Sequence, residues 1–215
     1  MQDGIFCSAY FPPIAYFKAM AQSSRVIIEG CETYCKQTYR NRCRILSANG
    51  ILSMTVPVCK SQDGNIRSVR IDYTKPWLRE HKRAMEAAYR SSPFFEYYCD
   101  DIFAILDSGI PDLFSMNYAL TVKLAEFTGL KTYFSVTEEY IKDYTGANDF
   151  RNTFDPKNTG LPESLRTARY YQVFSEKFGF TENLSVLDLL FNEGPNSVSF
   201  LLQNLKPTVR STLQL

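Results

Sequence analysis

The N-terminal third of the chain alternates short apolar runs with turn signals, a pattern typical of β-strands. Apolar residues over 5–10 and 26–28 predict two buried strands. Between them, after Pro12-Pro13, Ile14, Phe17 and Ala21 recur at helical spacing. A strand, a helix and a strand in so short a stretch favour parallel pairing through a crossover.

The next apolar runs predict a hairpin. Residues 42–46 and 52–58 flank Asn49-Gly50, a dipeptide that tolerates the positive φ of a tight hairpin turn. Further strands are predicted over 66–72 and 133–137. Parallel and antiparallel pairs would then coexist in a mixed sheet.

From residue 74 onward the spacing of apolar residues becomes helical. It predicts helices over 74–91, 94–106, 112–127, 184–193 and 197–204, with Thr74 as N-cap of the first. Residues 145–168 are rich in Gly, Asn and Pro without periodicity, which predicts a long loop, either functional or disordered. We therefore predict an α/β fold, with a mainly parallel sheet, an antiparallel hairpin and a helical C-terminal half. It forms one domain, 1–215, strand-rich over 1–73 and mostly helical over 74–215.

Composition narrows the class of protein. Lys plus Arg number 24 and Asp plus Glu 23, so a net charge of +1 creates no field that would attract nucleic acid. The chain has neither a signal-peptide pattern nor an apolar run of roughly 20 residues, so we expect a cytoplasmic protein without a membrane span. Six cysteines without CxxC spacing, and one histidine, predict reduced thiols and no metal site. The absence of GxGxxG, GK[ST], HExxH and GxSxG argues against several common enzyme classes.

The stretch 36–44 is the most unusual local feature, because it has four basic residues and no acid. Lys36, Arg40, Arg42 and Arg44 all have even numbers, so in one extended strand they would project from the same side. In a helix, Lys36, Arg40 and Arg44 would align at four-residue spacing, so either backbone predicts a positive stripe. Arginine presents a rigid fork to phosphate or carboxylate, which favours a phosphorylated or acidic small molecule as ligand. The alternative is a solvated edge strand guarded by charges.

Two single residues lie on apolar helix faces where polar groups are unusual. His81 is a candidate general acid or base, with a half-buried, hydrogen-bonded histidine as the alternative. Asp188 lies between Leu184 and Phe191, and a buried carboxylate there needs a partner, which an arginine of the basic stretch would supply. Such an ion pair would make Asp188 structural rather than catalytic.

Several segments together resemble the WbqC-like protein family. They are Tyr10-Phe11-Pro12 with Tyr16-Phe17, KQTYRNR at 36–42, Val56-Pro57, Trp77 with His81, and NLSVLDLLFNEGP at 183–195. The chain departs from the family at Ala15, where glycine is usual. It also lacks the YLSG-type segment of the family, and residues 148–151 and 170–172 occur instead. The resemblance implies a bacterial cytoplasmic protein of surface polysaccharide or O-antigen production, for which glycine or aminoacyl transfer to a sugar has been suggested.

Our first hypothesis is accordingly such a transferase. A non-catalytic binding or scaffold protein and a nucleotidylyltransferase-like enzyme are the alternatives; the latter lacks the paired histidines of that chemistry. The predicted partner is an anionic small molecule, no cofactor is identified, and a homo-oligomer is compatible with the sequence. The candidate catalytic residues are His81 and Asp188, and the candidate ligand-binding residues are Lys36, Tyr39, Arg40, Asn41, Arg42, Trp77, Gln172 and Asn192.

Overall fold

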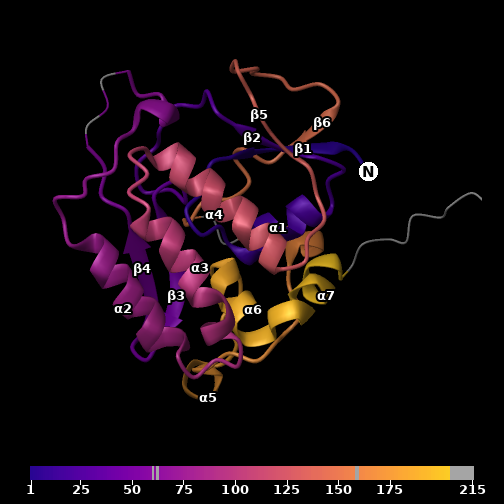
Figure 1. Ribbon diagram of the computed structural model, residues 1–215. Coiled ribbons are helices and arrows are strands. Elements are labelled where there is room, and N and C mark those ends of the chain that lie inside the picture. The colour runs from indigo at the N-terminus through magenta and orange to yellow at the C-terminus, as the bar shows by residue number, and fades with distance from the viewer. Residues whose placement is uncertain (60, 62, 158–159, 204–215) are drawn as a thin grey trace, which may run out of the picture.

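A parallel four-stranded sheet combines two strands from the N-terminal part of the chain with two from the C-terminal half. The computed structural model describes residues 1–59, 61, 63–157 and 160–203. Strand β1 (Asp3–Cys7) is central, β2 (Val26–Glu29) and β5 (Phe134–Val136) lie on one side, and β6 (Ala147–Asp149) lies on the other, all parallel (Figure 1). Helix α1 (Ile14–Ala21) connects β1 to β2. The predicted strand–helix–strand unit with parallel pairing is confirmed.

The predicted hairpin is also confirmed. Strands β3 (Arg42–Ser47) and β4 (Gly50–Thr55) pair antiparallel, with Gly50 at φ +100° in the turn. Cys43, Ile45 and Leu46 of β3 are buried, because this strand packs against helices α2 (Trp77–Tyr89) and α6 (Val186–Glu193). The hairpin forms its own two-stranded sheet rather than extending the parallel one, so the expectation of one mixed sheet is wrong.

In the view of Figure 1 the helices lie below the parallel sheet and on both sides of the hairpin. They are α2 (Trp77–Tyr89), α3 (Phe95–Asp107), α4 (Leu113–Phe127), α5 (Ser175–Phe178), α6 (Val186–Glu193) and α7 (Ser197–Leu202), with short 3₁₀ turns at Ile66–Ser68, Glu163–Leu165 and Gly194–Asn196. The long helices match the predicted ones within a few residues, although α2 has Pro76 at its N-cap instead of Thr74. The predicted end of the last helix, Asn204, lies outside the described residues.

One predicted strand is absent, and one predicted loop contains a short strand. Residues 66–72 form a 3₁₀ turn and isolated bridges, Val58 to Ile71 and Arg70 to Asp112, rather than a strand. The predicted loop 145–168 contains β6, whose residues pair with Asp3, Gly4 and Ile5 of β1. Residues 158–159 of this loop lie outside the described residues. Among the residues that are described, no helix combines the length and apolar character needed to cross a bilayer.

Candidate functional site

A polar pocket lies beyond the carboxyl ends of the parallel strands. From β1 the chain proceeds through β2 to β5 on one side and then returns to place β6 on the other side of β1. Open α/β sheets bind ligands at such a reversal of strand order. A pocket of about 230 Å³ occurs here, lined by residues that follow β2, β5 and β6 and by a loop before β3: Cys31, Glu32, Thr33, Cys35, Arg40, Tyr140, Arg151 and Asn152.

Glu32 and Arg40, which both line the pocket, form an ion pair. The Glu32 side chain is only 4% exposed and the Arg40 side chain 12% exposed. Glu32 Oε2 accepts a short hydrogen bond from Arg40 Nη2, and Glu32 Oε1 accepts one from the Ser8 backbone N–H at 2.9 Å. Burial raises the pKa of Glu32, although Arg40 and the Ser8 amide oppose the rise. A carboxyl group of raised pKa in a cleft is suited to proton transfer.

Asn117 of α4 fixes the backbone around this ion pair. Its Nδ2 donates to the Arg40 carbonyl at 2.7 Å and to Ser8 Oγ at 2.9 Å. One amide group therefore links the segment after β1 to the loop that carries Arg40. Its Oδ1 atom is buried and has no hydrogen-bond partner among the described residues.

Arg40 retains unused hydrogen-bond donors. A guanidinium group has five N–H bonds. In Arg40 one goes to Glu32 and one, from Nη1, reaches Thr38 Oγ1 at 3.3 Å, while the buried Nε has no partner among the described residues. The N–H groups that are left can bind an anionic or carbonyl oxygen of a ligand.

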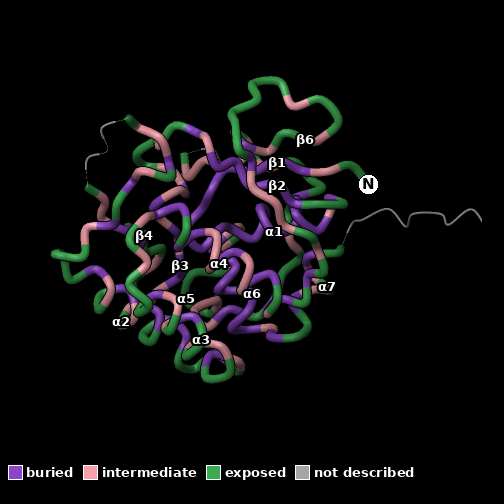
Figure 2. Tube along the Cα trace, turned by 45° about the horizontal axis from the view of Figure 1, so that its top comes forward, coloured by how far each residue is buried: buried purple, intermediate pink, exposed green. Residues whose placement is uncertain are grey.

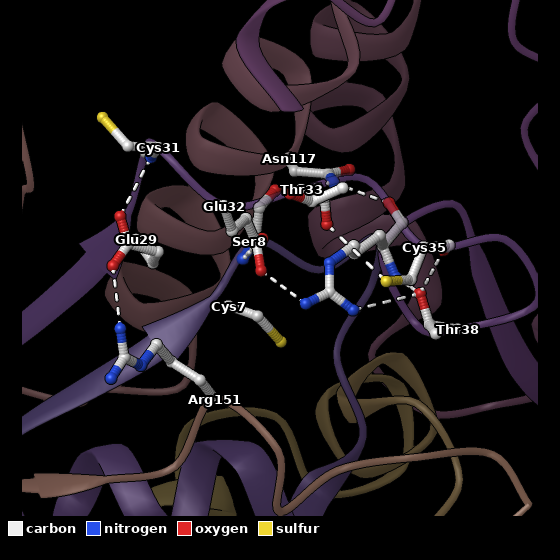
Figure 3. A network of polar contacts seen from close by, with 12 residues as sticks. Cys7, Ser8, Glu29, Cys31, Glu32, Thr33, Cys35, Thr38, Asn117 and Arg151 are labelled. Atoms are coloured by element: carbon white, nitrogen blue, oxygen red, sulfur yellow. Dashed lines mark hydrogen bonds and ion pairs between the residues drawn. The ribbon is translucent and has the colours of Figure 1, made fainter. Parts of the chain in front are cut away.

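A second cluster holds the turn after β2. Glu29, fully buried, accepts the Cys31 N–H at 2.9 Å and the Thr137 hydroxyl, and Thr137 Oγ1 accepts the Gly30 N–H at 2.9 Å. Figure 3 shows Glu29, Cys31 and Arg151 to one side of Glu32, with Cys35 and Thr38 on the other. These contacts fix the backbone that presents Cys31, Glu32 and Thr33 to the pocket.

The thiols near the pocket differ in exposure. Cys31 and Cys35 line it, whereas Cys7 is buried beneath it, and burial raises the pKa of Cys7 to about 12. All six cysteines are free. Within the described ranges, no group of three or more His, Cys, Asp or Glu side chains can hold a metal ion.

The structure divides the basic stretch between a loop and a strand. The chain turns at Gln37, where φ is +61°, and β3 begins only at Arg42, so the expectation of one continuous positive stripe is wrong. Of the predicted ligand-binding residues only Arg40 lines the pocket, and Lys36 is exposed on the same loop.

Tyr39, Asn41 and Arg42 lie beside the pocket lining rather than in it. Tyr39 is buried, and its carbonyl accepts the Tyr10 N–H at 2.8 Å. Asn41 is also buried and donates to the Val56 carbonyl at 2.9 Å, which anchors the end of the hairpin. Arg42 is half-buried at the start of β3.

His81 lies in a different part of the protein, on α2 beside the hairpin strand β4. Its Nδ1 is 2.9 Å from Tyr10 Oη, and its ring meets Trp77 edge-on at 5.1 Å between centroids. His81 and Trp77 are both buried, and burial lowers the pKa of His81 to about 4. A separate cleft of about 210 Å³, which includes Thr55 and Glu80, reaches the histidine.

Asp188 is buried in a third region, in the first turn of α6. Its Oδ2 accepts hydrogen bonds from Tyr170 Oη at 2.6 Å and Gln172 Nε2 at 2.9 Å, and Asn192 Nδ2 donates to its backbone carbonyl at 2.7 Å. Among the described residues, the hydrogen-bond partners of the Asp188 side chain are thus neutral. The prediction that an arginine of the basic stretch would pair with Asp188 is therefore wrong. Asp188, Gln172 and Asn192 do lie together, away from the pocket lining.

Most pocket residues were missing from the sequence-based candidates. Glu29 ends the buried strand β2 and Glu32 lies in the turn after it, and acidic residues at the end of a buried strand are a signal that the pattern offered. Arg151 and Asn152 follow β6, a strand too short to recognise from its residues. Tyr140 lies on the connection between β5 and β6, which is mostly exposed (Figure 2).

Comparisons with known proteins identify one relative and a family. The chain is 27% identical to the uncharacterised protein Rv1507c of Mycobacterium tuberculosis over 220 residues, covering 90% of this chain and 94% of that protein. No solved structure matches the chain. The model of the WbqC-like protein family matches residues 8–153, which include every residue that lines the pocket but not Gln172, Asp188 or Asn192. The chain therefore belongs to the WbqC-like protein family.

Proposed function

We propose that the protein is a cytoplasmic transferase of bacterial cell-surface polysaccharide biosynthesis, which transfers glycine or another aminoacyl group to a sugar. The family relationship suggests this role. The observation that supports a specific site for this role is the polar pocket at the reversal of strand order. There the buried carboxyl group of Glu32 lies beside the guanidinium of Arg40, which has unused hydrogen-bond donors.

In this proposal Arg40 and Glu32 have separate tasks. Arg40 binds a carboxylate or phosphate oxygen of a substrate through its unused N–H groups. A hydroxyl or amine of the sugar attacks the acyl carbon of an activated donor, and the bond to the leaving group breaks. Glu32 accepts the proton that the sugar loses, a role suited to a carboxyl group of raised pKa.

The volume of the pocket favours small substrates. At about 230 Å³ it falls below the roughly 300–1,000 Å³ typical of sites for drug-sized ligands. This size suits a monosaccharide unit or an amino acid better than a whole nucleotide sugar. The nucleotidylyltransferase-like alternative receives no support from the pocket, since the single histidine lies elsewhere.

Substitution of Arg40 tests the proposal. Arg40→Lys keeps the charge but loses the planar fork, so we expect it to weaken binding of glucuronate or phosphate about tenfold, measured by ligand-induced thermal shift. Arg44→Gln is the matched control, because Arg44 belongs to the same basic stretch but does not line the pocket. Weakening by Arg44→Gln together with unchanged binding by Arg40→Lys would assign binding to general charge and contradict the proposal.

The second candidate is a binding protein without catalysis. Its supporting observation is that Glu32 and Arg40 already compensate each other, as charges in a purely structural or binding site do. Glu32→Gln distinguishes the two functions. A transferase loses at least a hundredfold in turnover of a sugar acceptor while it still binds the acid ligand, whereas a binding protein has no turnover to lose.

A further inference from the structure

Arg151, the second arginine of the pocket, differs from Arg40 because all its donors are used. Its Nε donates to Asp149 Oδ1 at 3.0 Å. Its Nη1 donates to Glu29 Oε2 at 3.1 Å and to the Ile141 carbonyl at 2.8 Å. Its Nη2 donates to the Lys142 carbonyl at 2.9 Å and to Asp149 Oδ2 at 2.6 Å. With five N–H groups and an acceptor for each, Arg151 has none left for a ligand.

The acceptors of Arg151 join two parts of the protein. Glu29 and Asp149 end strands β2 and β6 of the parallel sheet. The Ile141 and Lys142 carbonyls belong to residues 138–146, the β5–β6 segment, which extends beyond the sheet edge (Figure 1). The Arg151 side chain is only 6% exposed although this segment is mostly exposed. One buried guanidinium therefore holds an exposed segment to the sheet.

Tyr140 is the residue that this segment contributes to the pocket. The Arg151 guanidinium lies 5.1 Å from the centroid of the Tyr140 ring, a cation–π contact on one face of the ring. The tyrosine lines the pocket and is 55% exposed. An exposed aromatic ring held beside charged groups gives a pocket an apolar surface next to its polar contacts, as ligand sites usually have.

We infer that Arg151 is a positioning residue that holds the β5–β6 segment against the sheet, and that Tyr140 thereby forms the pocket wall on which the ring of an acidic or phosphorylated sugar stacks. The stacking role rests on the proposed function, since it names the substrate class of the same site: a pyranose that carries an anionic group. Arg40 binds the anion and Tyr140 contacts the apolar face of the sugar ring.

The positioning role is tested without any ligand, by trypsin. Lys142 is exposed, but its carbonyl is bound to Arg151, so cleavage after Lys142 requires the segment to detach. Arg151→Gln should accelerate this cleavage at least tenfold, and Arg151→Lys should restore the slow rate only in part, because lysine lacks the fork. Arg25→Gln, which removes a surface pair with Asp3, is the control and should leave the rate unchanged. An unchanged rate in a folded Arg151→Gln variant would overturn the positioning role.

The stacking role is tested by binding of glucuronate, acetate and neutral glucose. We expect the protein to bind glucuronate at least tenfold more tightly than acetate, Tyr140→Leu to abolish that difference, and Tyr140→Phe to retain it. Tyr133→Leu changes an exposed tyrosine outside the pocket lining and should have no effect. These variants leave the contacts of Arg151 with Glu29 and Asp149 in place, so they remain informative if Arg151→Gln does not fold.

The outcomes separate this inference from the proposed function. Glucuronate binding that depends on Arg40 but not on Tyr140 would overturn the stacking role and leave the proposed function standing. Failure of all three probes to bind would contradict the proposed function and the stacking role together, while the trypsin result would still decide what Arg151 does.

Discussion

Asp188 provides the sharpest test of how a buried charge affects this fold. The side chain is almost completely buried, and burial raises its pKa from an ordinary value of 3.8 to about 6, although hydrogen bonds from Tyr170 and Gln172 oppose the rise. The folded protein therefore holds this proton more tightly than the unfolded chain does. The resulting stabilisation is complete below about pH 3.8 and is lost as the pH rises through about 6.

The size of this loss of stability follows from the pKa shift of Asp188. A change from 3.8 to about 6 corresponds to roughly 3 kcal/mol of unfolding free energy, of which roughly 2 kcal/mol is lost between pH 4.5 and 7.5. Asp188→Asn removes this titration. Both hydrogen bonds reach the same oxygen, Oδ2, so an asparagine carbonyl oxygen at that place keeps them.

Urea unfolding followed by the fluorescence of Trp77, the single tryptophan, measures the effect at each pH. The unfolding free energy of the variant minus that of the wild type should increase by roughly 2 kcal/mol from pH 4.5 to 7.5. A difference that stays flat over this range would show that Asp188 does not titrate there. A decrease would show that the folded protein stabilises its charged form.

Two further predictions concern other parts of the protein. Burial lowers the pKa of His81 from 6.5 to about 4, so its stabilising contribution is complete above pH 6.5 and is lost as the pH falls towards 4. The unfolding free energy of His81→Gln minus that of the wild type should therefore increase by roughly 2–3 kcal/mol as the pH falls from 7.5 to 4.5 in the same urea assay. This pH trend is opposite to that of Asp188→Asn. A free-energy difference that does not change with pH would contradict a buried neutral histidine. At Gly30 a Cβ atom would lie 2.6 Å from Arg67 Nη2 and 2.8 Å from Val136 Cγ1. Gly30→Ala should displace the Arg67 hydrogen bonds to the Gly30 and Thr137 carbonyls, both 3.1 Å, and cost roughly 1–3 kcal/mol; an unchanged urea midpoint would refute the close packing.

In the wild-type protein, the effects of His81 and Asp188 on stability oppose each other as the pH changes. As the pH falls from 6.5 to 4, His81 becomes destabilising while Asp188 becomes stabilising by a similar amount. The wild-type stability then changes little from these two groups. Only comparison with each variant separates them.

Local pattern predicted the elements whose residues carry their own signal. The β1–α1–β2 unit, the Asn49-Gly50 hairpin and helices α2 to α4 each have enough periodic apolar residues to bury one face, and this burial requires the predicted backbone. The same reasoning failed over 66–72, where apolar side chains are buried from a 3₁₀ turn and two isolated bridges. Over these residues the apolar pattern indicates which side chains are buried, but it does not indicate the backbone conformation.

The pocket depends on contacts between residues far apart in the chain. Strand β6 has three residues and is defined by its pairing with β1, and that pairing brings Arg151 and Asn152 beside Glu32. The turn at Gln37 directs Arg40 inward to Glu32 and leaves Lys36 exposed. The sequence by itself determined that several arginines were available close together and that β1 and β2 would pair in parallel. The tertiary structure alone decided which charges meet, because the register between strands and the direction of a loop are set by packing over the whole chain rather than by neighbouring residues.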